Sequence, residues 1–155
     1  MICFCCWTYL SPSPIYLIIR PVSSMNNKQV FDHFLAIPSD ISHIDRVQDF
    51  ARNILSTTDY PRETRHDIIL ALQEGVNNAI KHGNGSDSDH DVSIKMTMYD
   101  SHLELRIRDK GMGFDRDCLE DPTTPEQRMR CHGRGLLFME NYMDEICFVR
   151  TTGYH

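Results

Sequence analysis

Apolar side chains recur at two different periods along most of this chain. In residues 30–37 they alternate in the manner of a strand, and Phe31, Leu35 and Ile37 share one face. The proline that follows ends this strand, because its ring nitrogen has no hydrogen to donate to a sheet. The segment therefore predicts the first strand of the domain.

Two later segments follow the 3.6-residue period of a helix. The first is capped by Ser39 or Asp40, and its apolar stripe contains Ile41, Ile44, Val47, Ala51, Ile54 and Leu55. The second begins near Pro61 and ends at Gly83, and its stripe contains Ile68, Ile69, Leu72, Val76, Ala79 and Ile80. The pattern predicts two amphipathic helices after the first strand.

The rest of the chain returns to strand alternation. Residues 92–98 and 103–107 alternate apolar and polar positions on either side of a short turn, which predicts a hairpin with one buried face. Residues 114–132 have no sustained period, and a connection of this length is often a lid over a ligand. A short helix at 135–143 and a strand at 145–150 are the last predicted elements.

The first 24 residues differ in composition from everything after them, because they mix cysteines, aromatic residues and isoleucines with three prolines. We expect them to be an extension, either disordered or the product of a mis-assigned start, with Met25 as the natural first residue. A secretory signal places basic charge before its apolar stretch, whereas Arg20 follows it here. A weakly membrane-associating tail is the alternative. Residues 25–155 are then expected to form one domain.

Composition fits that single domain and limits its partners. A chain of 155 residues with 41% hydrophobic side chains can bury one substantial core. The formal net charge of -6, without a run of Lys and Arg, argues against direct binding of nucleic acid. The six cysteines lack paired C-x-x-C spacing, so free thiols in a reducing compartment fit better than a metal site. We therefore expect a cytoplasmic protein that does not bind membranes.

Glu74 and Asn78 are the first pair with candidate chemistry. They lie four residues apart on the second predicted helix, so their side chains project from the same side. A carboxamide oxygen can complete a magnesium shell built otherwise from water and phosphate, and a carboxylate one turn earlier can deprotonate an attacking hydroxyl. Taken alone, the pair is equally compatible with an exposed polar helix face.

Two glycine motifs supply further candidate ligand contacts. Asp109 follows a predicted strand and precedes Gly111 and Gly113, so the backbone can approach a flat ligand beside a carboxylate able to accept an adenine amino proton. Residues 133–135 (Gly-Arg-Gly) precede a predicted helix, where free amides, the helix dipole and an arginine can hold phosphate. Each motif alone also fits a plain turn.

In this order and on these elements, the three motifs resemble the GHKL (Bergerat) ATPase superfamily. The segments 72–83, 107–115 and 132–146 resemble more narrowly the bacterial anti-sigma-factor serine kinases, the RsbW and SpoIIAB type of switch protein. The resemblance implies an α/β fold: a two-layer sandwich with a mixed, mostly antiparallel sheet, helices on one face and an ATP site between the layers.

The resemblance also implies roles for individual residues. Glu74 would be the catalytic base, Asn78 the ligand of Mg²⁺ and Asp109 the adenine contact. The residues that would surround the remainder of ATP are Gly111, Gly113, Gly133, Arg134 and Gly135. Residues 114–132 would form the lid over the nucleotide, and Asn77 has no implied role.

The activity that the resemblance implies is ATP-dependent phosphorylation of a serine in an anti-anti-sigma factor, coupled to sequestration of a sigma factor by a homodimer. The sequence does not identify the particular sigma factor or phosphoacceptor. Family members usually carry one more strand beyond the position of His155. Either Gly153 begins a truncated version of this strand or the end is altered, and a missing strand would leave a sheet edge unpaired.

Three other classes of protein compete with this interpretation. A non-catalytic anti-sigma module that binds ATP would use the same residues. A histidine-kinase-like ATPase domain would need an upstream phosphoacceptor helix, for which residues 25–74 leave no room, and His66 and His82 are interpreted as local hydrogen-bonding residues. A structural domain without nucleotide would require three motifs to coincide by chance.

Overall fold

The computed structural model describes residues 14–19, 29–110, 139 and 141–148. Its strands form one sheet in the order β2-β3-β4-β1-β5, and each neighbouring pair is antiparallel. The strands are β1 (Pro14–Ile19), β2 (Gln29–Pro38), β3 (Asp91–Tyr99), β4 (Leu103–Arg108) and β5 (Glu145–Phe148). The predicted strands after Met25 are thereby confirmed within the described ranges.

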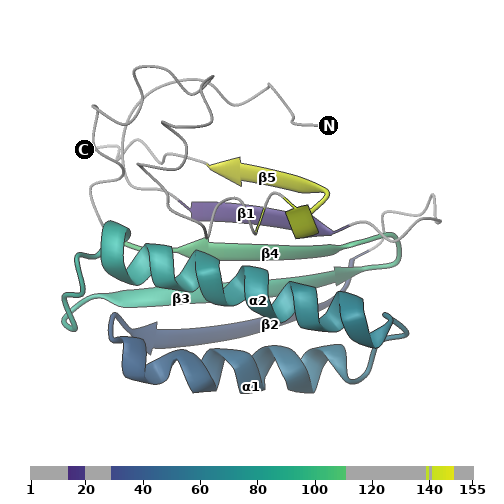
Figure 1. The fold of residues 1–155 in the computed structure, drawn as a ribbon, viewed down its shortest axis with the longest axis horizontal. Helices are drawn as coiled ribbons and strands as arrows, with labels where there is room; N and C mark the ends of the chain where they lie inside the picture. The colour runs from purple at the N-terminus through teal and green to yellow at the C-terminus, as the bar shows by residue number, and fades with distance from the viewer. Residues whose placement is uncertain (1–13, 20–28, 111–138, 140, 149–155) are drawn as a thin grey trace.

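Two helices lie on the same side of this sheet (Figure 1). A short 3₁₀ turn, η2 (Ile41–His43), leads into α1 (Ile44–Leu55). After a six-residue connection, α2 (Arg62–Asn78) runs back and continues as a π-helical turn, η3 (Ala79–Gly83). The expected two-layer α/β sandwich is confirmed, with the refinement that the described sheet is antiparallel at each pairing.

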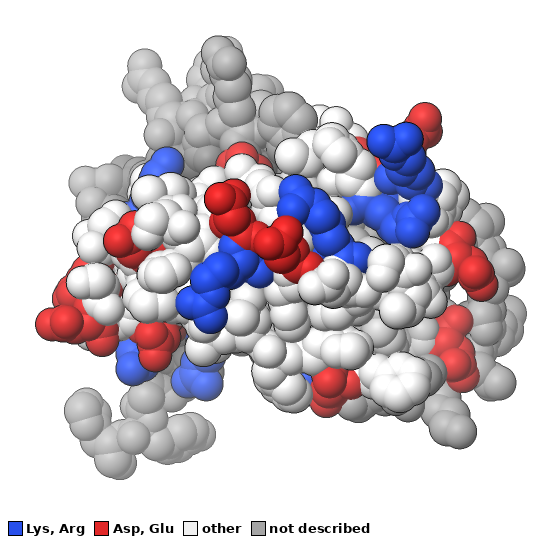
Figure 2. Space-filling view, turned by 90° about the horizontal axis from the view of Figure 1, so that it is seen from below, with Lys and Arg blue, Asp and Glu red and all other residues white. Residues whose placement is uncertain are grey.

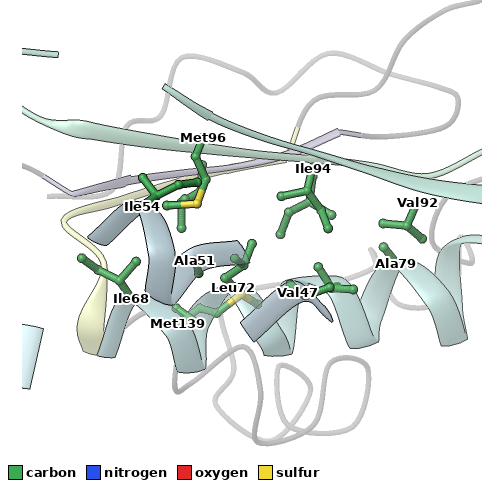
Figure 3. Packing of buried hydrophobic residues seen from close by; sticks show 14 of the residues in the cluster. Val47, Ala51, Ile54, Ile68, Leu72, Ala79, Val92, Ile94, Met96 and Met139 are labelled. Carbon is green, nitrogen blue, oxygen red and sulfur yellow. The ribbon is translucent and has the colours of Figure 1, made fainter. Parts of the chain in front are cut away.

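The core lies between the helices and the sheet. Figure 3 shows side chains of α1 and α2 pointing toward those of β3, and Met139 joins them from the later part of the chain. Leu72 and Ile94 are fully buried in this layer. Burial of an aliphatic side chain of this size contributes about 1.5–3 kcal/mol. The predicted apolar stripes therefore form the interface that joins the two layers, except for Ile41, which lies in the turn before α1 and is 51% exposed.

Asp40, rather than Ser39, caps the first helical segment. Its carboxylate accepts a hydrogen bond of 2.8 Å from the Ser42 backbone N–H. This bond holds the pKa of Asp40 below its ordinary value, because it favours the charged form. The cap therefore stabilises the fold above the pKa of the unfolded chain, and this contribution is lost as pH falls through the lowered pKa. Ser39 is buried and serves a different contact.

The face of the sheet opposite the helices carries polar and charged side chains. Lys95 forms an ion pair of 2.8 Å with Asp32, and the Thr97 hydroxyl donates to the same carboxylate at 2.8 Å. The Lys95 ammonium group also lies 5.1 Å from the ring centre of Phe34, which is 69% exposed. Phe31 lies on the predicted face with Leu35 and Ile37, because it pairs with Met98 in an unbroken alternation, but at the start of edge strand β2 it is 64% exposed.

The segment before Met25 contains β1, which was not expected. Residues 14–19 form a strand inside the sheet, where Leu17 pairs with Leu105 of β4 on one side and with Ile146 of β5 on the other. The expectation that this part of the extension is disordered is therefore wrong. In the sequence, Pro12 precedes the strand and Pro21 follows it. Pro14 occupies the first position of the strand, where a missing N–H is tolerated. That Met25 is the natural first residue stays a prediction. A chain that starts at Met25 would lack β1.

Several sequence predictions fall outside the described residues. They concern the lid at 114–132, most of the helix at 135–143 and the end of the sheet near residue 155. Of that helix, residues 139, 141 and 142 are helical, and the Met143 N–H donates to the Met139 carbonyl at 2.9 Å. Within the described part of the chain, no helix combines the length and apolar character that a membrane crossing needs.

Candidate functional site

The last two turns of α2 carry Glu74 and Asn78. Both residues are half-buried, and they project from the same side of the helix because they are four positions apart. Among the described residues, neither side chain is engaged in a hydrogen bond or ion pair. The regular helix ends at Asn78, and the π-helical turn follows directly. Such turns inside helices are frequent at functional sites.

Asp109 comes to this end of α2 from the sheet. It directly follows β4 and is only 8% exposed. Its carboxyl group lies so close to the Cα atom of Gly83 that a Cβ atom at position 83 would clash with it. The fold thus places the predicted adenine contact against the turn that extends the helix bearing Asn78. Nothing larger than glycine fits between them without moving the carboxylate.

Replacement of Gly83 by alanine is expected to displace the Asp109 carboxylate and lower nucleotide affinity about tenfold. The overpacking should also cost about 1–3 kcal/mol of unfolding free energy. Titration with a fluorescent ADP analogue and chemical denaturation measure the two effects. Gly85→Asn is the control in the same loop, because Gly85 has φ +62°, which asparagine tolerates, and no atom lies near its added Cβ. Equal affinity in both variants contradicts the prediction.

Asn84 is a residue of this site that the sequence did not single out. It follows the predicted end of the second helix in a polar stretch of sequence, yet it is buried and bonds to groups on three other parts of the chain. The pair Asn84 and Gly85 predicts a turn. No local signal predicts that the asparagine of such a turn faces inward, because its burial depends on residues far away in sequence.

Asn77 is the neighbour of the predicted metal ligand. Its side-chain oxygen is buried and has no hydrogen-bond partner in the described part of the structure. An unsatisfied buried acceptor carries a desolvation penalty of about 1–3 kcal/mol. Within the described part of the chain, this oxygen therefore gains no stabilising hydrogen bond.

Asn77→Ala is therefore expected to leave stability unchanged or to raise it by about 1 kcal/mol, because it removes the unpaired acceptor. Asn53→Ala, at an exposed position of α1, serves as the control for the higher helix propensity of alanine. Urea denaturation of both variants measures the difference. If Asn77→Ala instead weakens nucleotide binding, Asn77 belongs to the ligand site.

The residues assigned to the phosphate end of the site lie outside the described part of the structure. They are Gly111, Gly113, Gly133, Arg134 and Gly135. The structure therefore brings together Gly83, Asn84 and Asp109 at the end of the helix that carries Glu74 and Asn78, and the roles assigned to all the site residues stay predictions. Among the described residues, no cluster of three or more His, Cys, Asp or Glu side chains could hold a metal ion.

The polar side of α1 carries Asp45, Arg46, Asp49 and Arg52. Figure 2, which views the molecule from the α1 and β2 side, shows basic and acidic side chains interspersed. Arg52 forms an ion pair of 2.7 Å with Asp49 and a hydrogen bond of 2.6 Å to Gln48 on the same helix. These contacts within one helix are typical of a solvated charged face.

The α/β sandwich, with a buried acidic residue after β4 and a polar helix end beside it, is consistent with the GHKL-type ATPase fold to which the sequence motifs pointed. Residues 37–154 match the family described as the histidine kinase-like ATPase domain. The chain belongs to this family, and within it to the RsbW/SpoIIAB type of anti-sigma kinase.

Curated relatives agree with this assignment. The anti-sigma F factor of Priestia megaterium is 36% identical over 112 residues, covering 68% of this chain and 76% of that protein. The serine-protein kinase RsbW of Listeria monocytogenes serotype 4a is 25% identical over 118 residues, covering 72% and 75% of the two chains. RsbW of Bacillus velezensis is 26% identical over 118 residues, with coverage of 72% and 74%.

Proposed function

We propose that this protein is an ATP-dependent serine kinase that phosphorylates an anti-anti-sigma factor. It sequesters a sigma factor when the anti-anti-sigma factor is phosphorylated. The observation that carries the proposal is the placement of Asp109, buried against Gly83 at the end of the helix that bears Glu74 and Asn78. The names of the relatives, serine-protein kinase and anti-sigma F factor, support the same activity.

In this proposal, each residue acts on a different part of the reaction. Asp109 accepts a hydrogen bond from the adenine amino group, which selects the nucleotide base. Glu74 accepts the proton of the serine hydroxyl while the serine oxygen forms a bond to the γ-phosphorus of ATP. The bond between that phosphorus and the oxygen bridging to the β-phosphate breaks, and ADP leaves with the electron pair.

Asn78 fits the ligand set of a magnesium ion. Its carboxamide oxygen is a hard donor, and its side chain makes no hydrogen bond to another described residue. A bound Mg²⁺ neutralises charge on the phosphate oxygens of ATP. Asn78 would provide one protein ligand, and water and phosphate would complete the shell. The carboxylate of Glu74, one turn earlier, would remain available for the hydroxyl proton.

The partners are proposed from the family. A sigma factor and an anti-anti-sigma factor would bind to a homodimer in the cytoplasm, with no direct contact to nucleic acid. The self-paired charges on α1 favour a solvated role for that face, so the polar side of α1 is not assigned to either partner.

The test is incubation of the purified full chain with γ-labelled ATP, Mg²⁺ and a candidate anti-anti-sigma protein from the same organism. The proposal expects label to transfer to a serine of that protein, and not to an alanine variant of the serine. Nucleotide and sigma-factor binding without label transfer would instead support a non-catalytic anti-sigma module. Absence of nucleotide binding would refute both functions.

A further inference from the structure

Asn84 makes hydrogen bonds to three separated parts of the chain. Its amide nitrogen donates to the Ser39 hydroxyl at 2.5 Å and to the Asp91 carbonyl at 3.2 Å. Its side-chain oxygen accepts a hydrogen bond of 2.7 Å from the Lys110 backbone N–H. The residue is only 7% exposed. The end of β2, the start of β3 and the peptide after Asp109 are thus tied to one side chain.

The bond to Lys110 acts directly on the predicted adenine contact. The peptide that it holds is the one that joins Asp109 to Lys110, while Gly83 lies against the Asp109 carboxyl group. The two consecutive residues 83 and 84 therefore fix Asp109 through its side chain and through its following peptide. A carboxylate held in this way loses little conformational freedom when a ligand binds, which raises affinity and selectivity.

A carboxamide meets the requirements of this position with one side chain. It offers two N–H donors and one oxygen acceptor, and each of them is used here. Alanine leaves the Lys110 N–H and the Ser39 hydroxyl without this partner. Aspartate keeps an acceptor for Lys110 but cannot donate to the Asp91 carbonyl.

We infer that Asn84 is a positioning residue for base selection: it holds Asp109 so that the site prefers a purine with a 6-amino group over one with a 6-oxo group. This inference rests on the proposed function, because it takes Asp109 as the contact of the adenine amino group. In this proposal Asn84 acts through Asp109 and not by contacting the nucleotide itself.

The experiment compares the affinities of ADP and inosine diphosphate, which differ at the 6-position of the base. The full-length wild type is expected to prefer ADP by about tenfold or more, as one charge-assisted hydrogen bond provides. Asn84→Ala should reduce this preference to about twofold or less. Ser39→Ala is the matched control, because it removes one buried partner of Asn84 and leaves the bond to Lys110.

The results separate positioning from a general loss of stability. Both variants are expected to lower the melting temperature, and only Asn84→Ala should lose the base preference. An unchanged preference in Asn84→Ala overturns the inference while leaving the proposed function intact. A wild type that binds ADP and inosine diphosphate equally overturns the role of Asp109 as well, and one that binds neither refutes the proposed function.

If Asn84→Ala does not fold, Asn84→Asp takes its place. This variant keeps the acceptor for the Lys110 N–H, so the preference for ADP should remain at least fivefold. Loss of the preference in a folded Asn84→Asp protein would overturn the inference.

Discussion

Replacement of Glu74 by glutamine is expected to lower phosphoryl transfer to the serine acceptor by about 100-fold or more, because a general base typically contributes a factor of 10²–10⁴. Glutamine keeps the size of the side chain and removes the charge that accepts the hydroxyl proton. ATP affinity should change less than about twofold, since the adenine contact and the metal ligand are other residues. Single-turnover transfer of labelled phosphate and equilibrium binding of ATP measure the two quantities.

Glu63→Gln is the matched control for this substitution. Glu63 is an exposed acidic residue in the first turn of the same helix, and it lies three turns from Glu74. The control variant should retain the wild-type transfer rate, which separates the loss of one helix charge from the loss of the base. Transfer by Glu74→Gln at the wild-type rate would assign the proton to another group.

Deletion of residues 1–24 is expected to abolish cooperative unfolding or to lower the free energy of unfolding by at least about 3 kcal/mol, a large share of the 5–15 kcal/mol of a typical domain. β1 lies between β4 and β5, and it pairs at six positions with the first and at four with the second. Its removal leaves unpaired backbone groups on both neighbours and detaches β5 from the sheet. Urea denaturation followed by circular dichroism measures the loss.

Deletion of residues 1–12 is the control for that truncation. It removes most of the segment before β1 and keeps Pro14–Ile19 in place. This shorter deletion should unfold at nearly the urea concentration of the full chain. If the chain that starts at Met25 is as stable and as active as the full chain, β1 is dispensable and Met25 is the functional start.

Most elements after residue 28 could be predicted because their periods are strong. The stripe of α1 and the alternation in β3 and β4 each determine which face is buried, independently of distant residues. β1 could not be predicted in the same way. Its composition of prolines and aromatic neighbours suggested an appendage, and its pairing with Arg108 and Phe148 depends on segments far along the chain.

The candidate site shows the same division. Glu74, Asn78 and Asp109 were proposed from spacing and from residue type, and Gly83 was predicted only as the end of a helix. The contact of Gly83 with Asp109 and the inward orientation of Asn84 arise from the packing of η3 against the end of β4. Such close approaches are set by tertiary structure, so neither residue type nor spacing reveals them.

The central position of β1 also affects the order in which the sheet can be completed during synthesis. β1 is made first, yet its partners include Ile107 of β4 and Phe148 of β5, which leave the ribosome much later. Closing such long loops is slow, and an early strand without partners is open to aggregation until they arrive. Translation through Phe148 must therefore precede the last pairing, and a chaperone that shields the nascent β1 would raise the yield of folded protein.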